Sequence, residues 1–177
     1  MSRKKILAEL VSHDGLHDSL TGLLALPAFI ESATRIISST MRSNGSLNIF
    51  LVSLLNTNEP HVRQLAVTSQ RALPDMQESE INELAARMVM GAGILKREIR
   101  EADLACRYTF TDFILLNMGD YEVIAKKIQS IGEQITSSVV GTTIESASEN
   151  GGNLSAQNAL LSAIATVEAL QVAQSSQ

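Results

Sequence analysis

The stretch READLACRYTFTDF, residues 100–113, decides the fold of this chain. Its LACRY portion is apolar enough to form a buried strand, and DFILL, which starts at Asp112, is typical of a second buried strand. Only Thr109-Phe110-Thr111 separate the two, so the pattern predicts a strand, a tight turn and a strand between residues 104 and 116. None of the three turn residues can perform phosphate chemistry by itself.

Apolar residues recur at helical spacing in several segments on both sides of this hairpin. The expected helices are residues 3–12, a helix opened by Pro27, a long helix from Ile81 to Ile99, a helix capped by Asp120, and a final helix over about 154–173. In the final helix the residues expected to face inward are Leu160, Ile164, Val167 and Leu170. Residues 47–55 and 137–146 are apolar or β-branched and predict two further strands, whereas residues 56–80 predict a loop with one short helix.

This order of elements predicts an α/β fold with a mixed central sheet flanked by helices, close to the ferredoxin-like plan. The 177 residues and 45% hydrophobic content suit one core. We expect an N-terminal helix within residues 1–17, one domain over residues 18–174, and a short tail over residues 175–177.

Composition narrows the function classes. The net charge of −5 and the pI near 5.2 argue against a nucleic-acid surface, because phosphate contacts need a basic face. A small anionic ligand stays open, since one local basic pocket suffices. The single cysteine, Cys106, excludes an internal disulfide, and no apolar run is long enough to span a bilayer. A cytoplasmic protein without membrane insertion is expected.

Two motifs carry a resemblance to a known family. DSLTGLLALPAF, residues 18–29, resembles the opening signature of GGDEF domains, the diguanylate cyclase family, in which Asp-x-Leu-Thr-Gly-Leu precedes Ala-Phe. READLACRYTFTDF is similar to that family's Arg-x-x-Asp, buried strand and Gly-Gly-Asp-Glu-Phe hairpin. The two matches occur in the expected order, and the resemblance covers residues 18 to 173. It implies a GGDEF-like, nucleotidyl-cyclase-like fold.

The resemblance also implies condensation of two GTP molecules to cyclic di-GMP, but the hairpin residues argue against that activity. Glycines in the family's turn permit positive φ and a close approach to phosphates. Here they correspond to Thr109 and Phe110, whose side chains obstruct that approach, while Phe113 keeps the family's closing Phe.

The other residues that the chemistry requires are replaced as well. The hairpin's metal-binding acid becomes Thr111 or is shifted to Asp112, and the acid of the first strand falls at Ser53. A pair of Mg²⁺ ions needs hard anionic oxygens, which Ser53 and Thr111 do not supply. The guanine-reading residues have no counterparts in 56–80, and the phosphate-facing Lys of the last helix becomes Gln174. The sequence therefore predicts no catalysis, no metal and no cofactor.

One functional motif of the family survives. Arg100 and Asp103 stand where the resemblance implies the Arg-x-x-Asp motif that binds cyclic di-GMP. Arg offers a planar fork for guanine or phosphate oxygens, and Asp accepts hydrogen bonds from guanine nitrogens. Lys127 falls where the family often has an accessory Arg. The predicted ligand site is therefore Arg100, Asp103 and Lys127.

Simpler roles compete with these. Arg-x-x-Asp is a short pattern, and Arg100 with Asp103 can be a solvated ion pair that binds nothing. Arg107 is expected to cap a strand edge. The remaining polar candidates have structural interpretations: surface or turn roles for His13, His17 and His61, a turn fixed by Asp18 and Thr21, and packing for Cys106.

Two hypotheses follow from the sequence. In the first, a catalytically inactive GGDEF-like domain is a cyclic di-GMP receptor that relays the signal to a protein partner. In the second, the fold is a nucleotide-independent scaffold for protein interaction, with a homodimer formed through the apolar N-terminal helix. Neither hypothesis is enzymatic, and neither involves nucleic acid.

Overall fold

The computed structural model describes residues 12–43, 45–54, 78–144 and 155–174. Nearly all of the predicted helix over 3–12 and of the 56–80 segment, with His61, lies outside these residues. The described elements are α2 (Leu26–Arg42), β1 (Leu47–Ser53), α4 (Glu78–Glu98), β2 (Leu104–Arg107), β3 (Asp112–Met118), α5 (Tyr121–Gln134), β4 (Ser138–Thr143) and α6 (Ala156–Gln174). None of these helices is long and apolar enough to cross a bilayer.

The four strands form one sheet in the order β2-β3-β1-β4, which is the ferredoxin-like order. Each of its three ladders is antiparallel, so the prediction of a mixed sheet was wrong. The physical reason is that the hairpin places β3, rather than β2, beside β1. Strands that run in the same direction are therefore never neighbours. One isolated parallel bridge, between Leu24 and Cys106, lies at the outer edge of β2.

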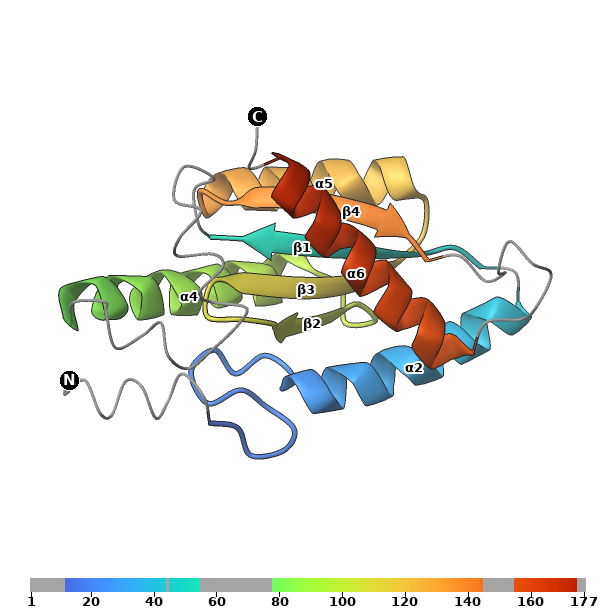
Figure 1. The fold of residues 1–177 in the computed structure, drawn as a ribbon, viewed down its shortest axis with the longest axis horizontal. Coiled ribbons are helices and arrows are strands. Elements are labelled where there is room, and N and C mark those ends of the chain that lie inside the picture. Colours follow the sequence, from blue (N-terminus) through green and yellow to red (C-terminus); the bar gives the residue numbers. More distant parts are fainter. Residues whose placement is uncertain (1–11, 44, 55–77, 145–154, 175–177) are drawn as a thin grey trace.

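Helices cover both faces of the sheet. Figure 1 shows α6 lying diagonally across one face with α2 beside it, while α4 and α5 lie behind the sheet. The α2/α6 layer packs on alternate strand residues such as Ile49, Cys106 and Ile114. The intervening residues, such as Phe50 and Phe113, face α4 and α5. This alternation follows from the period of two in a strand, which sends successive side chains to opposite faces.

Local sequence signals explain where the helices begin. Pro27 lies at the start of α2, where its missing N–H costs no hydrogen bond. Asp120 caps α5, and its Oδ1 accepts a hydrogen bond from the Val123 N–H at 3.1 Å, which satisfies one free donor of the first turn. Both predicted helix starts are therefore confirmed.

The final helix departs from the predicted pattern at one position. Leu160, Ile164 and Val167 are buried as expected, but Leu170 is 41% exposed and Gln171 is buried in its place. The inward residues Leu160, Ile164 and Val167 are separated by steps of four and three residues. With 3.6 residues per turn, the next position on the same helix face lies four residues after Val167, and not three. The inward position thus falls on a polar residue.

Candidate functional site

Arg100 and Asp103 belong to one turn that follows α4. The Arg100 N–H donates to Asp103 Oδ2 at 3.0 Å, and the Asp103 N–H donates to the Arg100 carbonyl oxygen at 3.0 Å. The carboxylate therefore closes the turn from which β2 starts. Asp103 is half-buried, whereas Arg100 is exposed. The backbone thus holds the two residues close together, and the structure leaves the arginine side chain in solvent.

The contact between these two residues is not the side-chain ion pair of the simpler interpretation. Arg97 with Glu98, and Arg107 with Asp18, are ion pairs of the described residues, but Arg100 with Asp103 is not. The Asp103 carboxylate instead uses one oxygen on the backbone. Within the described ranges, the guanidinium of Arg100 has no anionic partner.

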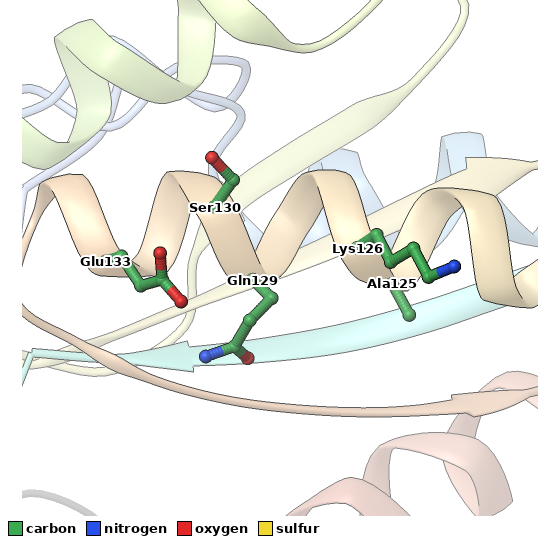
Figure 2. Close-up of a pocket in the computed structure, with 5 residues that line it drawn as sticks. All are labelled: Ala125, Lys126, Gln129, Ser130 and Glu133. Carbon is green, nitrogen blue, oxygen red and sulfur yellow. The ribbon is translucent and has the colours of Figure 1, made fainter.

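Lys127 lies on α5 and is exposed. No hydrogen bond or ion pair joins it to Arg100 or Asp103 among the residues that the structure describes. A shallow hollow of about 390 Å³ lies along α5, and Lys127 does not line it. Figure 2 shows the residues that do: Ala125, Lys126, Gln129, Ser130 and Glu133. The structure therefore unites Arg100 with Asp103 and gives Lys127 no contact with them.

The hairpin turn is held by its threonines. Thr109 Oγ1 donates to Asp112 Oδ2 at 2.5 Å and accepts from the Thr111 N–H at 3.1 Å. Neither Thr109 nor Phe110 has a positive φ, a conformation that Thr136 alone adopts among the described residues other than glycine. Side-chain hydrogen bonds thus form a tight turn where the family is expected to use glycine flexibility.

Ser53 and Asp112 lie side by side where the sheet ends. They are register partners in the β1–β3 ladder, and they are 0% and 4% exposed. Ser53 Oγ and Asp112 Oδ1 are buried and have no hydrogen-bond partner among the described residues. Such atoms carry a desolvation cost, so their burial side by side marks a polar site enclosed by protein.

Two side chains of α6 form hydrogen bonds with residues near this pair. Tyr108 Oη donates to Glu168 Oε1 at 2.6 Å, and Gln171 Nε2 donates to Ser138 Oγ at 2.6 Å. Ser138 is the register partner of Ser53 in β4. Burial, and then the hydrogen bond to Glu168, raise the pKa of Tyr108 above its ordinary value near 10. The phenol therefore stays neutral and acts as a donor at neutral pH.

The residues at the end of the sheet do not fit the pair of Mg²⁺ ions that the resemblance implies. Of the register partners Ser53 and Asp112, only Asp112 has a carboxylate. One oxygen of that carboxylate already accepts a hydrogen bond from Thr109. No group of three acidic, His or Cys side chains is arranged to hold a metal in the described part of the chain. Divalent metal sites of this kind depend on anionic oxygen ligands.

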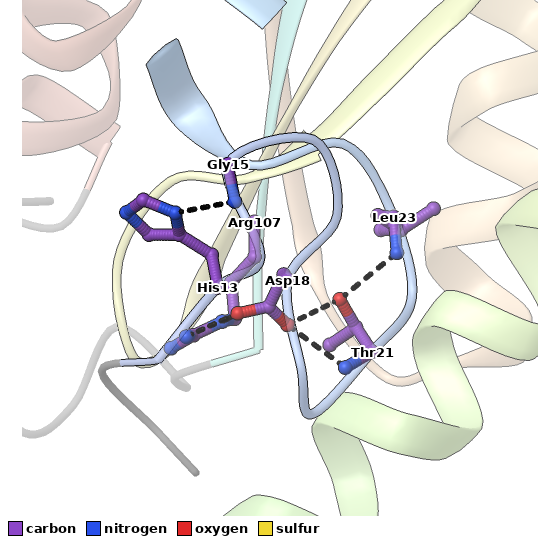
Figure 3. Close-up of polar contacts among 6 residues, drawn as sticks. All are labelled: His13, Gly15, Asp18, Thr21, Leu23 and Arg107. Carbon is purple, nitrogen blue, oxygen red and sulfur yellow. Dashed lines mark hydrogen bonds and ion pairs between the residues drawn. The ribbon is translucent and has the colours of Figure 1, made fainter. Parts of the chain in front are cut away.

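A buried ion pair joins the loop before α2 to the end of β2, and no sequence pattern predicted it. Figure 3 shows Asp18 between Thr21 and Arg107. Asp18 Oδ2 accepts from the Thr21 N–H at 2.8 Å and from Thr21 Oγ1 at 2.6 Å, which confirms the predicted turn. Asp18 Oδ1 accepts from Arg107 Nε at 2.8 Å and from its Nη2. Arg107 therefore has a buried partner and does not merely cap a strand edge.

The three lone polar side chains with predicted structural roles behave as follows. His13 is exposed and its Nδ1 accepts from the Gly15 N–H at 3.1 Å. His17 is exposed beside Asp14. Cys106 is fully buried and free, and burial raises the pKa of its thiol well above the ordinary value. Turn, surface and packing roles are thus confirmed for these residues.

Comparison with known structures identifies the fold. A sensory box/GGDEF family protein from Caulobacter crescentus CB15 matches with a TM-score of 0.56 and 18% identity, over 86% of this chain and 96% of that chain. The GGDEF domain of DgcB from Caulobacter crescentus, in complex with c-di-GMP, matches with a TM-score of 0.60 and 15% identity, over 90% and 91%. A microbial GGDEF domain with bis-cyclic di-GMP matches with a TM-score of 0.64 and 10% identity, over 89% and 91%.

The chain therefore has a GGDEF-like fold, as its two motifs predicted. No protein-family model and no curated protein sequence matches it. The low identities mean that the similarity establishes the fold, while the chemistry depends on the particular residues present here.

Proposed function

We propose that this chain is a catalytically inactive GGDEF-like signalling domain that binds cyclic di-GMP at Arg100 and Asp103 and relays the signal to a protein partner. The observation that carries the proposal is the turn after α4. It presents the exposed guanidinium of Arg100 without an anionic partner among the described residues, beside a half-buried carboxylate. A forked cation next to an acceptor suits guanine and phosphate groups. Two of the similar structures are complexes with this nucleotide, which supports the ligand class.

The absence of catalysis is part of the same proposal. Ser53 and Asp112 are buried register partners, and Thr109 occupies one oxygen of Asp112. Phosphoryl transfer needs metal ions to offset the charge of the triphosphate, and one enclosed carboxylate does not hold two of them. Lys127 is at most an auxiliary charge, since it has no contact with the Arg100 turn.

Calorimetric titration with cyclic di-GMP tests the receptor function. Wild-type protein should bind, and Arg100→Ala should weaken binding by about 1.5 to 3 kcal/mol, roughly ten-fold or more, because a charge-assisted contact is lost. Arg35→Ala provides a matched control, since Arg35 is an exposed arginine on α2. Its binding should equal that of the wild type.

Thermal melts separate ligand binding from a structural role of Arg100. The free energy of unfolding of Arg100→Ala, obtained from its melt, should lie within about 0.5 kcal/mol of the wild-type value, as is usual for substitutions of exposed residues. An absence of heat from wild-type protein at high micromolar nucleotide would contradict the receptor function. Equal binding by wild type and Arg100→Ala would place the ligand elsewhere.

A separate incubation tests catalysis. Protein with GTP and Mg²⁺ or Mn²⁺ should yield no cyclic di-GMP by chromatography above a control without protein. Product that scales with protein concentration would refute the proposed inactivity while leaving the receptor function open.

The second candidate is a nucleotide-independent scaffold for protein interaction. Exposed apolar side chains on α4, Val89 at 48% and Met90 at 53%, favour an interaction surface. A wild-type chain that binds no nucleotide but keeps a partner or self-association would support this candidate.

A further inference from the structure

One face of α4 points away from the domain. Five of its residues follow one another at steps of three, four, three and four: Glu83, Ala86, Met90, Gly93 and Arg97. All five are exposed. Steps of this kind place side chains along one stripe of a helix, and a repeated three-four step is the spacing of helices that pack against each other. We call these five residues the α4 stripe.

The middle of the α4 stripe is apolar and, apart from Met90, consists of the small residues Ala86 and Gly93. Met90 is 53% exposed, and Val89 beside it is 48% exposed. A Cβ added at Gly93 would meet no atom within 4 Å, so the helix backbone is open to close approach there. The opposite face, with Leu84, Met88 and Leu95 buried, packs on the domain. Figure 1 shows the N-terminal half of α4 projecting past the ends of the strands.

The order of residues in the α4 stripe is self-complementary about Met90. Glu83 lies seven residues before Met90 and Arg97 lies seven residues after it, with Ala86 and Gly93 as the small residues between. Two antiparallel copies related by a two-fold axis at Met90 would set Glu83 of each against Arg97 of the other. They would also bring Ala86, four residues before Met90, near Gly93, three residues after it. A two-fold interface requires this property, that residue i meets residue j and j meets i.

We propose that the α4 stripe is the contact surface for a second copy of this chain, packed antiparallel. A parallel arrangement would set Glu83 against Glu83 and Arg97 against Arg97, and like charges repel at such positions. Arg97 Nε already contacts Glu98 within its own helix at 3.1 Å, which leaves its remaining guanidinium N–H groups to bind across the interface. The proposal is independent of nucleotide binding at Arg100.

Charge reversal on the full chain tests the orientation and the surface together. In Glu83→Arg both charged ends of the stripe are positive, and in Arg97→Glu both are negative. Each variant alone should raise the dimer Kd at least ten-fold by sedimentation velocity. An equimolar mixture of the two should dimerise again, because each charged end then meets its opposite. Glu31→Arg makes the same charge change on exposed Glu31 of α2 and should leave self-association at the wild-type level.

Several outcomes would overturn the proposal. These are a wild type that stays monomeric at several hundred micromolar, charge-reversal variants that dimerise like wild type, and a mixture that stays monomeric. Should a reversal variant fail to fold by circular dichroism, Met90→Cys provides a second test. Its disulfide dimer should form on mild oxidation, since the two-fold axis places the two sulfurs together. Cys106 is fully buried and will not compete. Absence of that disulfide would reject the two-fold at Met90.

Discussion

At the scale of single residues, Asp18 shows what a motif conveys and what it omits. The spacing of Asp18 and Thr21 predicted a local turn, and the two residues form it. The pattern could not predict that the other carboxylate oxygen binds Arg107, which lies 89 positions away. Local patterns encode contacts within a few residues, whereas this pair exists only because the loop lies against the end of β2. Arg107 and Asp18 are 10% and 5% exposed, so each depends on the other for charge compensation.

Arg107→Met should destabilise the fold by about 3 to 5 kcal/mol, because it leaves the Asp18 carboxylate buried without its cation. Adding Asp18→Asn to this variant should recover part of the loss, so the two effects should not add. Urea denaturation of both single variants and the double variant measures the coupling. Arg35→Met, from the exposed pair with Glu31, should cost less than about 1 kcal/mol. Strictly additive losses would show that the two residues act separately.

Tyr108 gives a residue-scale prediction on pH. Burial, followed by its hydrogen bond to Glu168, raises the pKa of the phenol above its ordinary value near 10. As the pH rises past about 10, the unfolded chain therefore loses this proton before the folded chain does, and the free energy of unfolding falls. Tyr108→Phe should show a shallower alkaline decline in urea denaturation between about pH 8 and pH 11. The buried Cys106 thiol, whose pKa is also raised by burial, contributes to the decline in both proteins. An unchanged decline would refute the assignment to Tyr108.

At the scale of elements, the helices were easier to predict than the way in which they pack. Apolar periodicity located α2, α4 and α5, but α4 begins at Glu78 and ends at Glu98, rather than running from Ile81 to Ile99. Nothing local indicated why β4 contains a glycine. The Phe50 ring lies against Gly141 and stacks on Tyr121 with centroids 5.7 Å apart. Tyr121 Oη then donates to the Gly141 carbonyl oxygen at 3.0 Å, so three elements meet at this glycine.

The same substitution should have opposite effects at two glycines. In Gly141→Ala the new Cβ would lie 2.3 Å from two ring atoms of Phe50, and the forced repacking should cost about 1 to 3 kcal/mol. In Gly93→Ala the new Cβ meets nothing within 4 Å, and the helix interior should gain about 0.5 to 1 kcal/mol. Thermal melts at low micromolar protein, where self-association is minimal, compare the two. Equal shifts of the same sign would contradict this account of Gly141.

At the scale of the whole molecule, the sequence predicted the element order and the family-like fold but gave the wrong strand directions. Directions depend on which strand of the hairpin lies beside β1, and local hydrophobic patterns do not indicate that choice. For the candidate site, the sequence predicted the proximity of Arg100 and Asp103 and the position of the hairpin. It did not reveal that Asp103 binds the Arg100 backbone or that Glu168 and Gln171 of α6 bind Tyr108 and Ser138.

The two hydrophobic cores share the strands between them, so the molecule should unfold as one unit. Ile128→Ala, in the α4/α5 layer, should lower stability by about 2 to 5 kcal/mol. Cys106 lies in the opposite layer. In this variant its thiol should become reactive in the same urea transition in which the helices unfold. Thiol labelling and far-UV circular dichroism along one urea series check the coincidence. Loss of helix signal before Cys106 reacts would mean that the layers unfold separately.

The contact between the loop before α2 and β2 has a consequence for the solution behaviour of the chain. An edge strand whose backbone N–H and C=O groups are unpaired can pair with a strand of another molecule and so start aggregation. The loop before α2 covers the free edge of β2, where the Leu24 N–H donates to the Ala105 carbonyl oxygen at 3.2 Å. The Asp18–Arg107 ion pair holds the loop in this position. A shortened chain that starts after Ala25 would expose the edge of β2. We expect this variant to precipitate during purification, whatever its effect on ligand binding.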